Sequence, residues 1–185
     1  MLCFRGLFYG EDLNMNRIRK IVLSGLLLAM GLVLPFVTGQ IPQIGSMLLP
    51  MHIPVLLCGY VCGWKYGLVV GFVTPVLRSM LFAMPPMMTA IAMAFELAAY
   101  GAVTGFLHEK LPGKKVKIYI SLLIAMIAGR IVWGIVSLVI YGLTNAAFTW
   151  QIFIGAALLN AIPGIILQII VVPILVMAIE KNWSK

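Results

Sequence analysis

The chain has 185 residues, of which 63% are hydrophobic and only 10% are charged, and its mean hydropathy is +1.11. A soluble domain carries about a quarter charged residues, so this composition excludes a water-soluble globule. The net charge of +8 would favour nucleic-acid binding in a soluble protein, but the basic residues lie mainly between apolar runs. The positive-inside rule for membrane proteins explains that excess, and we expect an integral membrane protein.

Six apolar segments predict one all-α domain of six transmembrane helices with short loops, because runs of about 18–20 apolar residues cross the hydrocarbon core. The expected bounds are 18–37, 51–64, 66–82, 88–107, 118–141 and 151–179. The runs do not alternate, which argues against a β-barrel. Residues 18–181 form this domain, and residues 1–17, with Met15 as an alternative start, are expected to be a disordered or peripheral tail.

The basic residues in the loops between the helices predict how the chain is oriented across the membrane. Lysine and arginine gather at the termini, at Lys65, which marks a short turn, and in the loop around 110–117. The other three connections have none outside the region of Arg78, and Pro85-Pro86 breaks the chain in one of them. Because basic loops stay in the cytoplasm, both ends are expected inside the cell.

Small residues recur four positions apart in the predicted helices, a spacing that lets helix backbones approach closely in lipid. Ordinary internal packing is the favoured interpretation for most of these pairs. The pairs are Gly59 and Gly63, Gly67 and Gly71, Gly101 and Gly105, and Gly25 and Ala29.

Four polar residues, Arg78, Glu96, Arg130 and Asn160, fall inside predicted helices, where a charged group is costly and usually marks function. Counting about 1.5 Å per residue from each helix start places all four in the outer half of a core about 30 Å thick. One common depth predicts a polar cavity open to the outside, with net positive charge from two Arg against one Glu. The alternatives are a purely structural ion pair between Glu96 and Arg130, and an Arg78 that reaches the outer interface.

Aromatic residues and a proline border the same region. Trp133 lies three residues after Arg130 on the same helix face, which favours a pocket role, whereas Tyr141 and Trp150 suit the interfacial aromatic belt. In "LLNAIPGIILQ", Pro163 cannot donate to the carbonyl four residues earlier, so we expect a kink there. A broken helix that lines a cavity and a plain proline kink both remain open.

The stretch "LLPMHIPVLLCGYVCGWKYG" contains His52, Cys58 and Cys62. A soft metal site needs three or four converging ligands, so we predict no metal and interpret the cysteines as small packing residues. His52 is expected to line the pocket mouth. The chain has no phosphate-binding loop, no H-E-x-x-H or G-x-S-x-G motif and no pair of intramembrane Asp residues, so we expect neither an enzyme nor a cofactor.

The stretches "LLPMHIPVLLCGYVCGWKYGLVVGFVTPVLRSMLFAMPP", "TAIAMAFELAAYGAVTGFL" and "LLNAIPGIILQ" resemble the substrate-binding S components of energy-coupling factor (ECF) vitamin transporters, over about residues 18–180. The resemblance implies a subunit of the bacterial cell membrane that captures a vitamin or precursor from outside. A membrane T component and two ABC ATPases then supply movement and energy. The chain looks closest to the pantothenate and hydroxymethylpyrimidine or pyridoxine group. The arginines favour an anion, and pantothenate is the first candidate.

The resemblance also implies roles for residues. Gly25 and Ala29 match the small residues that pack on the T component, with Gly in place of the first Ala, and residues 39–50 would form a lid. The implied ligand contacts are Gln40, Gln43, Glu96, Tyr100, Arg130, Trp133 and Asn160. His52 and Arg78, inferred from their positions above, complete the predicted site.

Two other functions compete with this one. A stand-alone secondary transporter or channel for a small anionic solute would use Glu96 as a proton-responsive group, but the chain shows no internal repeat of the transporter type. A membrane enzyme lacks visible catalytic groups.

Overall fold

The computed structural model describes residues 4–37, 50–112, 116–143 and 162–183, and everything below refers to these ranges. They form α-helices without any strand, so the all-α class is confirmed. The helices, in chain order, are α1 (Phe4–Val37), α3 (His52–Cys62), α4 (Trp64–Phe82), α5 (Met87–Lys110), α6 (Val116–Leu143) and α8 (Ile162–Trp183).

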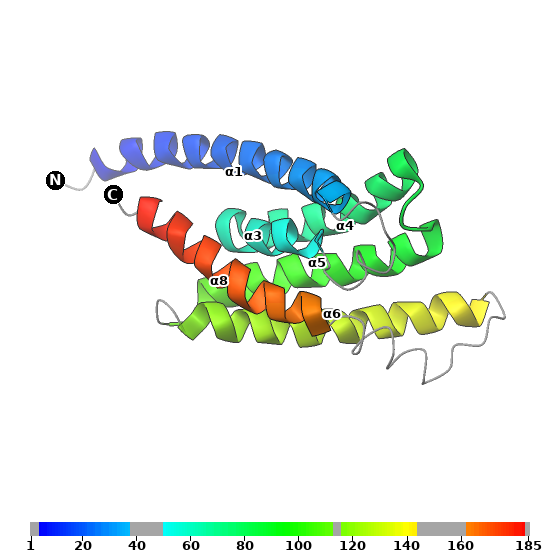
Figure 1. The fold of residues 1–185 in the computed structure, drawn as a ribbon. Helices are drawn as coiled ribbons and strands as arrows, with labels where there is room; N and C mark the ends of the chain where they lie inside the picture. Colours follow the sequence, from blue (N-terminus) through cyan, green and yellow to red (C-terminus); the bar gives the residue numbers. More distant parts are fainter. Residues whose placement is uncertain (1–3, 38–49, 113–115, 144–161, 184–185) are drawn as a thin grey trace.

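Five of the helices are long and apolar enough to cross a membrane: α4, α5, α6, α8 and the Arg17–Phe36 part of α1. Helix α3 has 11 residues and therefore a length of about 16 Å, half of a hydrocarbon core. Nine of its residues are buried, because α3 lies inside the bundle against α1, α4, α5 and α8 (Figure 1). The count of six crossings stays a prediction.

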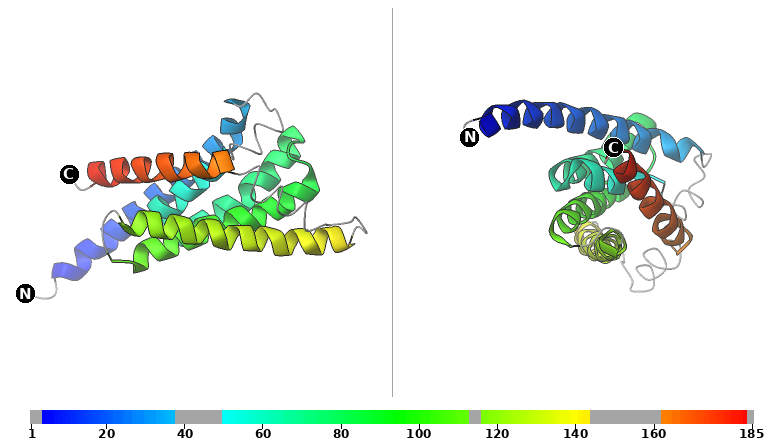
Figure 2. Two further views of the ribbon diagram at one scale, coloured as in Figure 1. Left: turned by 60° about the horizontal axis from the view of Figure 1, so that its bottom comes forward. Right: turned by 90° about the vertical axis from the view of Figure 1, so that its left-hand side faces the viewer.

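The two ends of the described chain lie at the same end of the bundle, where α1 begins and α8 finishes (Figures 1 and 2). Helix α5 also ends there and α6 begins there, so this end carries Lys110, Lys117 and Lys181. The basic residues are therefore segregated as expected, while the orientation across the membrane stays a prediction.

The outer surface of α6 is apolar. Ile127, Ile131, Ile135 and Leu138 are each more than half exposed, whereas Leu122 and Ala125 on the other face are fully buried. A soluble monomer rarely exposes such a continuous apolar stripe, and lipid would cover it in a membrane.

Glycines bring α3, α4 and α5 into backbone contact. A Cβ built on Gly101 would lie 2.2 Å from the carbonyl oxygen of Gly67, and one on Gly71 would lie 2.3 Å from that of Leu97. Only glycine permits this approach, so these positions serve internal packing, as expected. A Cβ on Gly25 of α1 would meet nothing within 4 Å.

The helix boundaries differ from the expected ones at the turn between α3 and α4 and at the ends of α5 and α6. The turn after α3 lies at Gly63, whose φ is 96°, and the prediction of a turn at Lys65 is wrong. Glycine tolerates this φ because it has no Cβ, and Lys65 instead lies in the first turn of α4. Helices α5 and α6 extend the predicted segments by one to three residues at each end.

The bounds of the first and last helices, α1 and α8, differ from those of the predicted segments. Helix α1 begins at Phe4, so the backbone of the expected tail is helical and continuous with the first apolar segment. Its peripheral location stays a prediction. Pro163 is the second residue of α8, and the predicted kink there involves residues 151–161, which lie outside the described ranges.

Candidate functional site

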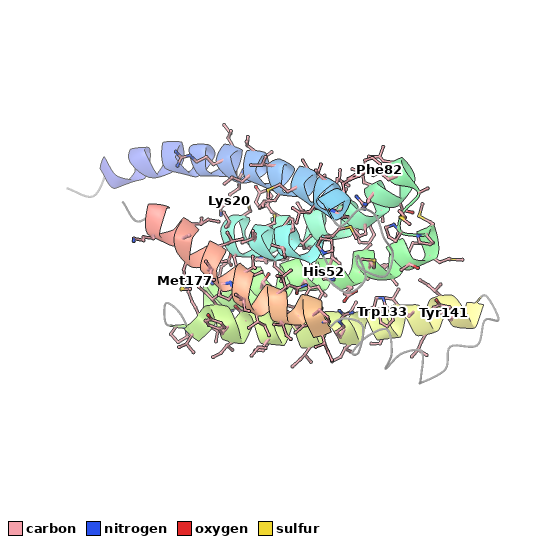
Figure 3. The ribbon with its side chains drawn as sticks, in the orientation of Figure 1. Lys20, His52, Phe82, Trp133, Tyr141 and Met177 are labelled. Atoms are coloured by element: carbon pink, nitrogen blue, oxygen red, sulfur yellow. The ribbon has the colours of Figure 1, made fainter. Side chains whose placement is uncertain are left out.

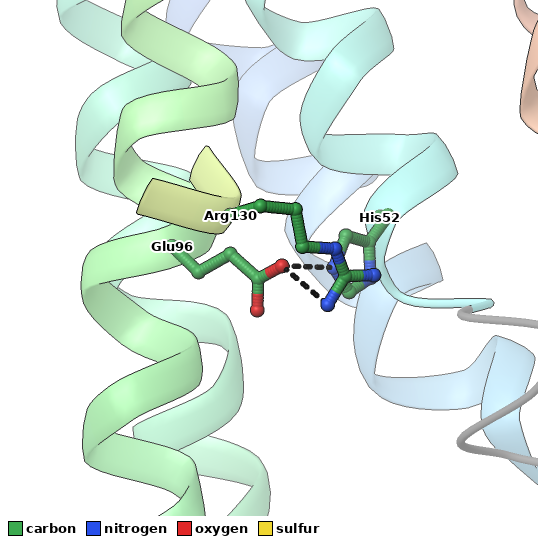
Figure 4. Close-up of polar contacts among 3 residues, drawn as sticks. All are labelled: His52, Glu96 and Arg130. Atoms are coloured by element: carbon green, nitrogen blue, oxygen red, sulfur yellow. Dashed lines mark ion pairs between the residues drawn. The ribbon is translucent and has the colours of Figure 1, made fainter. Parts of the chain in front are cut away.

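Three helices bring polar side chains together in the interior. The Glu96 carboxylate of α5 is 2% exposed, and its Oε1 lies 3.1 Å from Nη1 of Arg130 on α6 (Figure 4). The same oxygen lies 3.8 Å from Nε2 of His52, the first residue of α3, which is fully buried. The side chains of Glu96, Arg130 and His52, called the Glu96 cluster below, form the most concentrated group of ionisable atoms inside the described bundle.

Packing around Tyr100 positions this cluster. Tyr100 follows Glu96 by one helical turn, so both lie on the same face of α5. Its ring makes an edge contact with the His52 ring, with 5.2 Å between centroids. On the other side, Gly129 of α6 packs so closely on the Tyr100 ring that a Cβ there would lie 3.0 Å from Cζ. Tyr100 therefore supports His52 and also sets how near α6 approaches.

Among the described residues, several buried atoms of the Glu96 cluster have no hydrogen-bond partner: Nε and Nη2 of Arg130, and both ring nitrogens of His52. Oε1 of Glu96 is close to Arg130, yet its geometry does not make a hydrogen bond, so that contact is electrostatic. Leaving a buried polar group unpaired costs roughly 1–3 kcal/mol. Such a cluster is expected to gain stability from a polar ligand.

The unpaired atoms of Arg130 define what that ligand would offer. Nε and Nη2 form one edge of the planar guanidinium, and their N–H groups point the same way. This edge fits two oxygens of one carboxylate or phosphate. The opposite nitrogen, Nη1, faces Glu96, so the ion pair and an anionic ligand do not compete for the same edge.

A narrow groove lies between α5 and α6, one helical turn away from the cluster, and no residue of the cluster lines it (Figure 3 labels two of its residues, Trp133 and Tyr141). Its ends nearest the cluster are Ala92, one turn before Glu96, and Trp133, one turn after Arg130. The groove volume is about 30 Å³, well below the ~150 Å³ cavity that holds benzene. The remaining lining residues are Met88, Thr89, Ser137, Ile140 and Tyr141.

Arg78 is not part of this cluster. Its Nη1 donates to the carbonyl of Leu32 in α1, and its guanidinium carbon lies 5.0 Å from the ring centroid of Phe36. The centroid of the Phe82 ring lies 5.5 Å from the same carbon, and this ring makes an edge contact with the Phe36 ring. With Arg78 packed against α1, the cluster holds one positive and one negative charge when His52 is neutral. The net positive charge expected from the sequence is therefore not present there.

The sequence matches the family described as ECF transporter, substrate-specific component, over residues 19–176. The chain belongs to this family. No curated protein and no solved structure matches it. As an S component, the protein is a multi-pass membrane subunit of a transporter, in a family that is not an enzyme family and that works with a T component and ATPases.

Helix α1 of this S component presents an uncovered face. Val22, Gly25, Ala29 and Val33 are exposed along one side of the helix, and no atom lies within 4 Å of a Cβ built on Gly25. The buried residues Ser24 and Leu27 turn towards the bundle instead. The two small residues thus form a shallow depression in a surface of larger apolar side chains.

Not every predicted contact of the S component lies in the described ranges. Gln40, Gln43 and Asn160 fall outside them. Conversely, the sequence analysis overlooked Gln168 of α8, which is 1% exposed and whose Nε2 has no hydrogen-bond partner among the residues that the structure describes. A lone amide within the apolar run "IILQII" is the signal that identifies it.

Proposed function

We propose that this S component captures a small vitamin or vitamin precursor that carries a carboxylate, with pantothenate as the first candidate. The observation that supports this class is the buried edge of Arg130, Nε and Nη2, which has no hydrogen-bond partner in the described part of the chain and fits a carboxylate. Glu96 remains on the other side of the guanidinium and holds it in place.

Another part of the ligand would border the groove between α5 and α6, whose volume of about 30 Å³ is too small to enclose a whole vitamin. Trp133 offers an apolar surface there, and the hydroxyls of Thr89 and Ser137 suit the amide and hydroxyl groups of pantothenate. Tyr100 supports the site from behind through its contact with His52. Gln40, Gln43 and Asn160 stay predicted contacts of the outer part of the ligand.

The partner complex would form on α1. We assign docking of the T component to the uncovered face around Gly25 and Ala29, because small residues let a second helix approach closely in lipid. Two ABC ATPases would then drive uptake into the cell across the bacterial plasma membrane.

Mass spectrometry of small molecules released from the purified protein tests the substrate, followed by calorimetric titration with pantothenate and with panthenol. Panthenol replaces the carboxylate by an alcohol. It should bind at least about tenfold more weakly, since hydrogen bonds to charged groups contribute about 1.5–3 kcal/mol. Release of a vitamin without any anionic group, or equal affinity for both compounds, would contradict the proposal.

A further inference from the structure

We propose that His52 is a specificity-determining residue, which takes up a proton when a carboxylate binds to Arg130 and so keeps the buried site electrically neutral. This inference rests on the proposed function, because it assumes that the unpaired edge of Arg130 receives an anion. It adds a distinct property, namely that binding is linked to protons.

The charges in the Glu96 cluster require such a compensation. Without ligand, Arg130 and Glu96 balance each other at 3.1 Å. A bound carboxylate adds a second negative charge beside the same guanidinium, in a place where Glu96 is 2% exposed. An uncompensated charge in a buried site is strongly unfavourable. One proton from solvent on the imidazole would restore neutrality.

His52 has the position and the chemistry for this role. It is completely buried, and its Nε2 lies 3.8 Å from Oε1 of Glu96. Neither ring nitrogen has a hydrogen-bond partner within residues 4–37, 50–112, 116–143 and 162–183, so both can donate in the protonated form. Histidine is also the side chain whose charge changes most readily near neutral pH.

The other helices packed against α3 offer no substitute among the described side chains. Helix α5 contributes Glu96 and Tyr100 near His52, and its His108 contacts the Tyr60 ring near the other end of α3. Arg78 of α4 is directed to the carbonyl of Leu32 in α1. The described acids are Glu96 and Glu109, and Glu109 is exposed at the far end of α5. The charged side chains described in α1 and α8 lie at that same end: Arg17, Arg19, Lys20 and Lys181.

The proposal predicts which ligands depend on pH. If binding takes up one full proton, affinity for a carboxylate falls by about tenfold per unit rise in pH. Affinity for an uncharged analogue stays constant, because no extra charge enters the site. His52 thereby makes the affinity for anionic ligands depend on pH, whereas the affinity for neutral ligands does not.

Isothermal titration calorimetry of the detergent-purified protein tests this directly. The probes are pantothenate and biotin, each compared with its uncharged analogue, panthenol or biotin amide. Titration in buffers of different ionisation enthalpy should reveal uptake of up to about one proton per bound carboxylate and none with the analogues. Equal affinity of the unchanged protein for a carboxylate at about pH 6 and about pH 8 would overturn the proposal.

Two variants separate His52 from Glu96 as the proton acceptor. His52→Asn should abolish proton uptake and lower carboxylate affinity at about pH 6 by about tenfold. Glu96→Gln should also abolish uptake but strengthen carboxylate binding, because Arg130 is then unbalanced. A His52→Asn protein that keeps its thermal unfolding temperature and still takes up the proton would overturn the role of His52.

The two proposals fail in different ways. If neither carboxylate binds to the unchanged protein, the inference is overturned together with the carboxylate assignment. Co-purification with the T component and ATPases would then still support the transport role.

Discussion

Gly129 in α6 lies directly against the ring of Tyr100 in α5, with 3.0 Å between an added Cβ and Cζ. Arg130 is the next residue after Gly129, and Glu96 precedes Tyr100 by one turn. This glycine–tyrosine contact therefore fixes the distance at which the two charged side chains meet, and through the Tyr100 ring it also supports His52.

Gly129→Ala adds only one methyl group, but we expect it to disturb the site strongly because of this contact. The methyl group must displace a ring that is 1% exposed, and overpacking of this kind costs about 1–3 kcal/mol. We expect affinity for pantothenate to fall by about fivefold or more, measured by calorimetry. Gly142→Ala in the same helix is the matched control, because nothing lies within 4 Å of its Cβ position. Equal effects of the two variants would argue against this role of Gly129.

Gly101→Ala should lower the stability of the bundle. Its new Cβ would collide with the backbone oxygen of Gly67 at 2.2 Å, so α4 and α5 must separate. Thermal unfolding in detergent should show a clear drop in midpoint, corresponding to at least about 1–3 kcal/mol. Gly25→Ala, which meets no neighbour, should leave the midpoint unchanged. A Gly101→Ala protein as stable as Gly25→Ala would exclude a tight contact between α4 and α5.

Gly25→Trp and Ala29→Trp should block assembly without affecting the isolated subunit. Both positions face away from the bundle, so an indole there would occupy only the space where we propose that a partner helix docks. Co-purification with the T component and ATPases should be lost, while pantothenate affinity remains. Ile131→Trp, on the exposed apolar stripe of α6, serves as control and should assemble normally. Normal assembly of both α1 variants would refute docking at this face.

Arg78→Met should loosen α1 from α4. The change removes the hydrogen bond to the Leu32 carbonyl and the contacts with Phe36 and Phe82, and bonds to charged donors contribute about 1.5–3 kcal/mol. We expect a lower unfolding midpoint, with Lys65→Met at an exposed position as control. An unchanged midpoint for Arg78→Met would show that this contact contributes little.

Much of the fold follows from hydropathy alone, because long apolar runs must form helices in lipid. The interior location of α3 does not follow from it. Its sequence is apolar all round, and that pattern is the same for a helix facing lipid and for one enclosed by other helices. His52 was therefore expected at a pocket mouth, whereas it is fully buried.

The sequence also predicted only part of the Glu96 cluster, because depth along a helix can be counted and rotation about its axis cannot. Counting residues along each helix gives depth, and depth correctly placed Glu96 and Arg130 at one level, where they pair. It gives no information on rotation about the helix axis, so Arg78 at a similar depth was expected in the cavity although it packs on α1. Gln168 lies eight residues after Asn160 in the sequence, so it fell outside the level considered.

The most direct test compares the pantothenate dissociation constants of Arg130→Ala and Arg78→Ala, two variants that each remove one buried guanidinium. The Nε and Nη2 edge of Arg130, which no described residue pairs, predicts a loss of about tenfold or more for Arg130→Ala, because a charge-assisted hydrogen bond contributes about 1.5–3 kcal/mol. Arg78→Ala, which loses only contacts around Leu32 and Phe36, should bind within about twofold of the unchanged protein. Unchanged affinity for Arg130→Ala, or an equal loss in both variants, would contradict a substrate site at Arg130.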